Sequence, residues 1–149
     1  MKNLIWLASY PKSGNTWLRT CLMLGLTGNI SLDKLIEVIP YFPKLNNRYF
    51  RDLKFDDSKE AARAAVKKWD RTQEDLSNSI GDKVIILKTH QIFGSINNVM
   101  FPNPKYAHSV VQIVRDPRDV VMSYRAHYGH SVDKAIEKII DEKNSISEI

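Results

Sequence analysis

Short apolar runs alternate along the chain with longer segments whose apolar residues recur every three or four positions. Continuous apolar runs predict three buried strands, at residues 3–8, 84–87 and 110–114. Helical spacing predicts helices at residues 16–26, 31–39 and 131–140, a further helix capped by Ser58, and another that Asp116 opens with proline at its first position. Residues 41–57 and 91–106, which contain proline, asparagine or glycine, are interpreted as irregular. Strands alternating with helices favour an α/β fold with a parallel sheet flanked by helices.

The chain has 149 residues, which predicts one domain spanning residues 1–149, and no repeat or linker divides it. Apolar residues make up 43% and charged residues 26%, so collagen-like and wholly disordered classes are excluded. No apolar run approaches the ~20 residues that cross a bilayer, and no membrane contact is expected. The single Cys21 excludes an intrachain disulfide and favours a reducing, cytoplasmic compartment.

Acidic residues are unevenly distributed along the chain, and their placement says more about a binding partner than the net charge of +5 does. A net charge of this size does not by itself indicate that the protein binds nucleic acid. No acid occurs before Asp33, and none occurs from Lys83 through Arg115. These two stretches hold Lys2, Lys12, Arg19, Lys83, Lys88, Lys105 and Arg115. If the stretches meet in space, they form a cationic pocket that suits a compact anion; if they do not, the clustering is chance.

Three loops follow the three predicted strands, and each carries a cation. Residues 10–16 contain Lys12, residues 88–90 begin with Lys88, and residues 115–119 begin with Arg115. In a parallel α/β sheet, ligands bind at the carboxyl ends of the strands, where loops lead into helices. The spacing therefore predicts an anion site at that edge.

The first loop has the parts of a phosphate cradle. Gly14 permits close approach of the backbone, the amides that follow it open a helix, Lys12 adds a full charge and Thr16 a hydroxyl donor. The loop is not a Walker A motif, because its lysine precedes its only glycine. A nucleoside triphosphatase or P-loop kinase is therefore disfavoured. The alternative is a plain strand–turn–helix junction.

The third loop carries a second anion signal. Arg115 ends a strand and Ser123 lies eight residues further on, within the following helix. Arginine and a serine hydroxyl can share a phosphate. Arginine at a strand end can equally pair with a nearby acid, here Asp116 or Asp119, and the motif alone leaves both interpretations open.

Three motifs in this order resemble the cytosolic sulfotransferase family. The run YPKSGNTWLR at residues 10–19 resembles that family's 5′-phosphosulfate loop, and VQIVRDPRDVVMSY at residues 111–124 resembles its 3′-phosphate motif. Between them, residues 88–90 (KTH) resemble the strand that carries the catalytic histidine. The resemblance spans roughly Leu4 to Ile140 and implies a P-loop-like, three-layer α/β core in shortened form.

The resemblance implies a sulfotransferase that moves a sulfuryl group from 3′-phosphoadenosine 5′-phosphosulfate to a hydroxyl or amine of a small molecule, with adenosine 3′,5′-bisphosphate as product and no metal. It makes His90 the general base, Lys12 the stabiliser of the leaving phosphate and Lys88 a ligand of the sulfuryl group. It assigns donor binding to Lys12, Ser13, Gly14, Asn15, Thr16, Trp17, Arg115 and Ser123, with Trp17 against the adenine.

The sequence departs from the family in two respects. The family's Arg-Lys-Gly lid over the 3′-phosphate is absent, and Asn15 replaces the threonine of many members. A fragment, a naturally reduced protein and a site completed by another chain would each explain the first departure. The alternative function is a non-catalytic or partner-completed module that binds a nucleotide bisphosphate. The apolar stripe at residues 132–140 predicts either self-association or weak stability.

Other residues have weaker signals. Cys21, at helical spacing from Trp17, is expected to pack as a small core residue. The aromatic residues Tyr41, Phe42, Tyr49, Phe50 and Phe55 either line an acceptor pocket or pack onto the core. We expect structural or surface roles for His108, His127 and His130.

Overall fold

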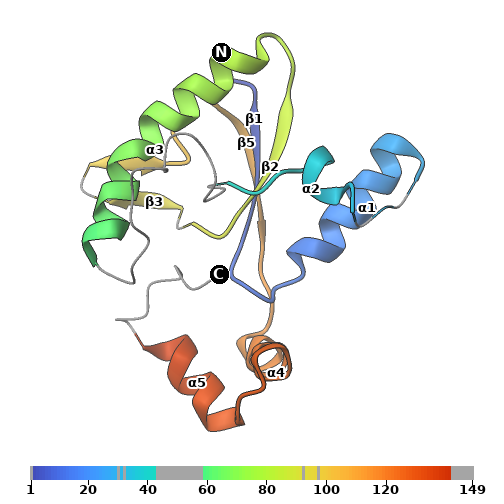
Figure 1. Cartoon of the computed structure of the whole chain (residues 1–149), viewed down its shortest axis with the longest axis vertical. Coiled ribbons are helices and arrows are strands. Elements are labelled where there is room, and N and C mark those ends of the chain that lie inside the picture. The colour runs from blue at the N-terminus through green and yellow to red at the C-terminus, as the bar shows by residue number, and fades with distance from the viewer. Residues whose placement is uncertain are drawn as a thin grey trace.

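A three-stranded parallel sheet forms the centre of the computed structural model, which describes residues 2–29, 31, 33–42, 59–91, 93–96 and 98–141. The strand order is β2-β1-β5, with β1 (Leu4–Ser9) between β2 (Ile85–Thr89) and β5 (Ala107–Ile113). Both neighbours run parallel to β1 (Figure 1). The three predicted strands and their parallel arrangement are thus confirmed, and the carboxyl ends of all three strands lie at one edge.

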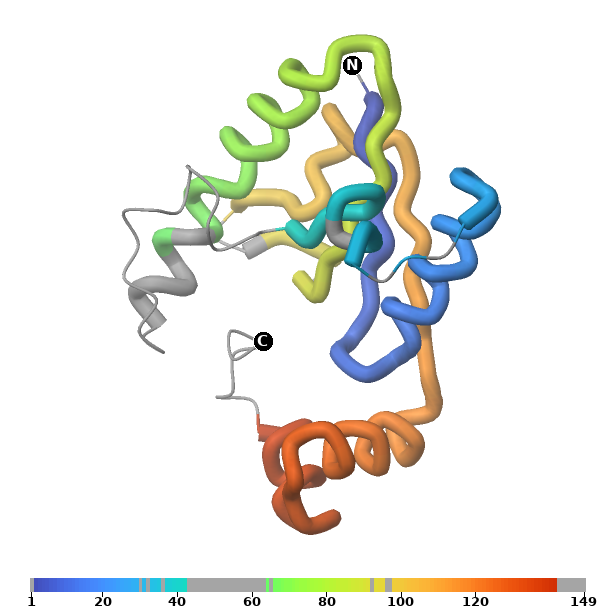
Figure 2. The backbone as a smooth tube through the Cα atoms, turned by 45° about the vertical axis from the view of Figure 1, so that its right-hand side comes forward, coloured from blue at the N-terminus to red at the C-terminus, as the bar shows by residue number. Residues whose placement is uncertain are grey.

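Helices flank the sheet. The described helices are α1 (Asn15–Thr27), α2 (Leu35–Val38), α3 (Lys59–Ile80), α4 (Pro117–Tyr128) and α5 (Val132–Ile140). In Figure 1, α3 lies on one side of the sheet and α1 on the other, while α4 and α5 lie beyond the carboxyl edge. Figure 2 shows the same separation after rotation.

Two of the predicted helix caps are confirmed. The Asp116 side chain accepts from the Arg118 N–H at the start of α4, and the Ser131 hydroxyl accepts from the Lys134 N–H at the start of α5. The helix predicted from Ser31 is shorter, because a turn precedes it and α2 begins at Leu35. The predicted Ser58 cap lies outside the described residues.

A small hairpin occupies part of the segment interpreted as irregular. Strands β3 (Gly94–Ile96) and β4 (Val99–Phe101) pair antiparallel, with Ile96 opposite Val99. The prediction of an irregular loop over residues 91–106 was therefore wrong at these positions. Asn98 has a φ of 64°, the left-handed conformation that asparagine tolerates in two-residue hairpin turns.

A cluster of buried apolar residues lies on the α3 side of the sheet. Trp6 of β1 packs edge-on against Phe42 and Phe101, with ring centroids 5.0 and 4.9 Å apart, and Trp69 of α3 packs on Phe101. Burying an aromatic side chain of this kind stabilises the fold by about 1.5–3 kcal/mol. Phe42 is therefore a core residue. Tyr49, Phe50 and Phe55 lie outside the described residues.

The opposite face of the sheet is covered by the less apolar side of α1. The buried residues of this helix are Asn15, Arg19 and Met23, at spacings of four. Cys21 is exposed, so its predicted packing in the core was wrong. The reason is that α1 turns a partly polar stripe inward, and the stripe that begins with Trp17 faces solvent.

Asn3 connects several elements at the amino end of the sheet. Its side-chain amide donates to the carbonyls of Ser77 and Gly81 at the end of α3, and its Oδ1 accepts from the Ser77 hydroxyl at 2.6 Å. Its backbone N–H donates to the Tyr106 carbonyl, and its own carbonyl accepts from the Ile85 N–H. One fully buried residue thus ties α3, β2 and the start of β5 to β1.

Candidate functional site

The loop between β1 and α1 forms an open cradle of backbone amides. Gly14 caps α1 with a φ of 102°, a conformation that favours glycine, and Lys12 has a φ of 64°. No side chain caps the helix, and its first turn contains no acidic residue. The unpaired amides and the helix dipole therefore leave this end of α1 suited to an anion.

The side chains of this loop divide into buried and exposed groups. Asn15 is only 4% exposed, and its amide donates to the Leu7 carbonyl and to the Ser9 hydroxyl, both at 3.1 Å. Ser13 is also buried, whereas Thr16 and Trp17 are exposed, Trp17 by 73%. Asn15 can therefore reach a phosphate only through its backbone N–H, whereas the Trp17 ring is accessible to a ligand.

His90 directly follows β2 and is 7% exposed. Its Nδ1 lies 2.7 Å from the Ser9 carbonyl oxygen and 3.2 Å from the Ser9 hydroxyl. Burial lowers the pKa of His90 to about 4; the hydrogen bond to Ser9 opposes this shift, and the charges of Lys88 and Arg19 add to it. The ring is therefore neutral near pH 7.

Lys88, two residues earlier in β2, lies next to the same site. Its Nζ stands 4.7 Å from the centre of the Tyr41 ring. Main-chain hydrogen bonds hold Tyr41 beside Lys88, because the residues on either side of Tyr41 pair with β2. The Phe42 N–H donates to the Lys88 carbonyl, and the Lys88 N–H donates to the Pro40 carbonyl. Burial lowers the pKa of Lys88 to about 8, and the charges of Arg19 and Lys12 lower it further.

Arg19 is a residue of the site that the sequence motifs did not single out for a role. It is 5% exposed, and its Nη2 donates to the carbonyls of Leu35 and Ile39 at 3.2 and 2.6 Å. Its Nε is buried without a partner, and no carboxylate in the described part of the chain pairs with it. The helical spacing of Arg19 four positions after Asn15 was the available signal.

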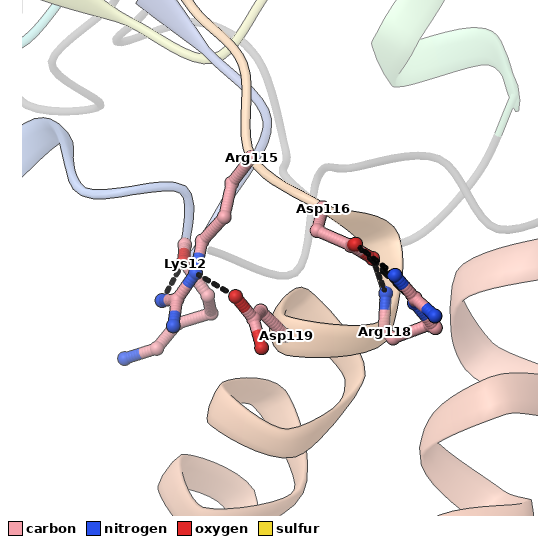
Figure 3. Close-up of polar contacts among 5 residues, drawn as sticks. All are labelled: Lys12, Arg115, Asp116, Arg118 and Asp119. Carbon is pink, nitrogen blue, oxygen red and sulfur yellow. Dashed lines mark hydrogen bonds and ion pairs between the residues drawn. The ribbon is translucent and has the colours of Figure 1, made fainter.

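Arg115 links the third loop to the first. Its Nη1 donates to the Lys12 carbonyl at 3.2 Å, and its Nε lies 3.7 Å from Asp119 (Figure 3). Asp116 is occupied by Arg118 instead, at 2.6 Å. Of the pairings left open by the sequence, the one with Asp119 is therefore present, although exposed pairs of this kind contribute little stability. Ser123 lies one helical turn after Asp119, on the same face of α4.

The remaining histidines are separate from this arrangement. His108 is exposed in β5, while His127 and His130 lie with Tyr128 in an aromatic group at the end of α4. Among the described residues, no three His, Cys, Asp or Glu side chains converge as metal ligands would. None of the helices described is both long and apolar enough to span a membrane.

The site therefore combines an uncapped amide cradle, two partly or fully buried cations without acidic partners in the described residues, a neutral histidine and Arg115 at one sheet edge. No curated protein matches the sequence. A family model does match, over residues 2–147, and its description is "Sulfotransferase domain". The match covers nearly the whole chain and agrees with a parallel sheet flanked by helices, so the chain belongs to the sulfotransferase-domain family.

Proposed function

We propose that the chain transfers a sulfuryl group from 3′-phosphoadenosine 5′-phosphosulfate to a hydroxyl or amine of a small molecule. The observation that carries this proposal is the meeting of three loops at the carboxyl edge of β2-β1-β5. Arg115 donates to the Lys12 carbonyl, and His90 contacts the Ser9 carbonyl at the end of β1. Family membership supports sulfuryl transfer in general. The donor and the acceptor class are the proposed part.

The cradle at α1 suits the 5′-phosphate of the donor. The backbone amides after Gly14 are uncapped, and Lys12 brings a cation to the oxygen that bridges phosphorus and sulfur. Negative charge develops on that oxygen as the bond to sulfur breaks, and fixed amides and cations stabilise such charge without reorganising. In the same proposal, Arg115 and Ser123 bind the 3′-phosphate, and the exposed Trp17 ring stacks on the adenine.

His90 supplies the base on the acceptor side. The acceptor oxygen attacks sulfur, its proton passes to His90, and the bond from sulfur to the 5′-phosphate oxygen breaks, releasing adenosine 3′,5′-bisphosphate. A pKa of about 4 makes His90 a weak base in the free protein. The bound donor adds negative charge beside Lys88 and His90, which raises the pKa of both groups and strengthens the base.

The low pKa of His90 is also the observation that favours a second candidate, a module that binds a nucleotide bisphosphate without chemistry. Such a module needs Lys12 and Arg115 but no base. Tyr41, whose ring centre lies 5.9 Å from that of His90, belongs to the enzyme proposal instead, because it places an aromatic wall beside the base for an acceptor.

Two substitutions separate the candidates. His90→Ala should lower turnover by about 10²–10⁴-fold and leave the affinity for adenosine 3′,5′-bisphosphate nearly unchanged. Arg115→Ala should weaken that affinity by about 1.5–3 kcal/mol, and Arg125→Ala, an exposed arginine elsewhere on α4, is the matched control. Turnover is followed with labelled donor against an acceptor panel, and affinity by calorimetry. Binding without transfer to any acceptor favours the module, and equal affinity for ATP contradicts the 3′-phosphate assignment.

A further inference from the structure

A buried row of hydrogen bonds connects the start of α1 to His90. The Asn15 amide nitrogen donates to the Ser9 hydroxyl at 3.1 Å, and that hydroxyl lies 3.2 Å from Nδ1 of His90. All three side chains are less than a tenth exposed. The row lies directly behind the loop that the proposed donor would occupy.

Chemistry fixes the direction of two of these contacts. A carbonyl oxygen can only accept, so the Asn15 nitrogen, and not Oδ1, must face the Leu7 carbonyl. For the same reason, Nδ1 of His90 must carry the proton that it shares with the Ser9 carbonyl at 2.7 Å. The oxygen of the Ser9 hydroxyl, which already accepts from Asn15, is then a second acceptor for the Nδ1–H of His90, beside the Ser9 carbonyl. Nε2 is left as the nitrogen with the lone pair.

We propose that Asn15 and Ser9 are positioning residues that hold His90 in its Nδ1–H form and present Nε2 as the proton acceptor. The role of His90 as a base rests on the proposed function, but its protonation form does not. The Asn15 amide donates to the Ser9 hydroxyl, which leaves that hydroxyl oxygen facing His90 as an acceptor. The same amide also holds the carboxyl end of β1 by donating to the Leu7 carbonyl.

A packing role alone does not explain Asn15. Its Oδ1 is buried without a partner, an energetic cost that an apolar residue of similar size would avoid. The surroundings of His90 leave only the position of its proton, on Nδ1 or on Nε2, to be controlled. Burial, with a smaller contribution from the charges of Lys88 and Arg19, already keeps the imidazole neutral, so the remaining variable is which nitrogen bears the proton.

The first measurement needs no substrate. Long-range ¹H–¹⁵N correlation spectra of the full chain report which imidazole nitrogen is protonated. We expect His90 in the Nδ1–H form at neutral pH. The opposite form, or an even mixture, in the unsubstituted protein overturns the proposal whether or not the chain proves to be an enzyme.

The second measurement uses Ser9→Ala and Asn15→Leu, with Thr20→Ala as control, because Thr20 donates only to a backbone carbonyl on the exposed face of the same helix. Both site variants keep the Ser9 carbonyl as one acceptor of Nδ1–H, but Ser9→Ala removes the hydroxyl acceptor and Asn15→Leu releases it from Asn15. Each should therefore increase the fraction of the Nε2–H form and lower kcat about tenfold, with bisphosphate affinity changed less than about threefold. Asn15→Thr, which keeps a donor, should recover part of kcat. If Asn15→Leu does not fold, Ser9→Ala and the spectrum of the unsubstituted protein decide. Unchanged protonation form and kcat in Ser9→Ala refute the proposal.

Discussion

Raising the pH from about 7 to about 9 should weaken the binding of adenosine 3′,5′-bisphosphate roughly tenfold through Lys88 alone. In the free protein, burial and the charges of Arg19 and Lys12 lower the pKa of Lys88 from 10.5 to about 8. Tyr41 and His90 also face it and are uncharged in this pH range. A bound dianion supplies the missing negative charge and returns the pKa toward 10.5.

The sign follows from proton linkage. Below pH 8, Lys88 is charged in both the free and the bound protein, so the affinity is flat with pH. Above pH 8, the free protein has lost this proton and must regain it on binding, so the affinity falls as the pH rises. At pH 8, with half of the free molecules neutral at Lys88, binding should take up about half a proton.

Calorimetry in two buffers of different ionisation enthalpy measures both the affinity for the bisphosphate and the number of protons taken up on binding. Lys88→Arg keeps a cation that does not titrate in this range, and it should abolish the slope and the proton uptake. Lys83→Met removes an exposed lysine just before β2 and should behave like the unsubstituted protein. The bisphosphate itself is almost fully ionised above pH 7. A flat profile in the unsubstituted protein, or an equal slope in Lys88→Arg, would refute the placement of Lys88 beside the ligand.

Burial lowers the pKa of His90 from 6.5 to about 4, so as the pH falls the unfolded chain binds a proton at this histidine before the folded protein does. The free energy of unfolding should therefore fall by about 3 kcal/mol from pH 6.5 to pH 4. Urea titrations should show that His90→Gln lacks this part of the decrease. Arg19→Met removes a charge that lowers the pKa of Lys88, so the loss of bisphosphate affinity should shift to higher pH, and an unmoved calorimetric profile would contradict this. Trp17→Ala should change the free energy of unfolding by less than about 0.5 kcal/mol, since the side chain is exposed. It should weaken the binding of the bisphosphate by about 1–3 kcal/mol. An affinity equal to that of the unsubstituted protein by calorimetry would argue against stacking.

The sequence predicted the elements whose signals are local. Continuous apolar runs located β1, β2 and β5, and the side chains of Asp116 and Ser131 marked two helix starts. The hairpin of β3 and β4 was missed, because its strands are only three residues long and lack a clear alternation.

The inward stripe of α1 could not be predicted in the same way. Its apolar residues suggested that Cys21 would be buried, whereas the helix turns Asn15 and Arg19 inward. Those polar residues are stable there because groups outside α1, including the carbonyls of Leu7, Leu35 and Ile39, accept their hydrogen bonds. Contacts of this kind depend on tertiary structure, which the spacing of residues does not encode. The Arg115 contact with Lys12, 103 residues away, is of the same type.

The two ends of the sheet should differ in local unfolding, because Asn3 links several elements at one end only. At its end of the sheet, one side chain and its backbone satisfy groups from α3, β2 and the segment before β5. Opening any of these elements there breaks hydrogen bonds in the others, so amide hydrogens near Asn3 should exchange only in global unfolding. At the opposite end, α1 begins without a cap and with buried polar atoms unpaired at Asn15 and Arg19. Hydrogen exchange there should be faster and should slow when a ligand binds, so that the fixed end acts as the support on which the responsive end is ordered.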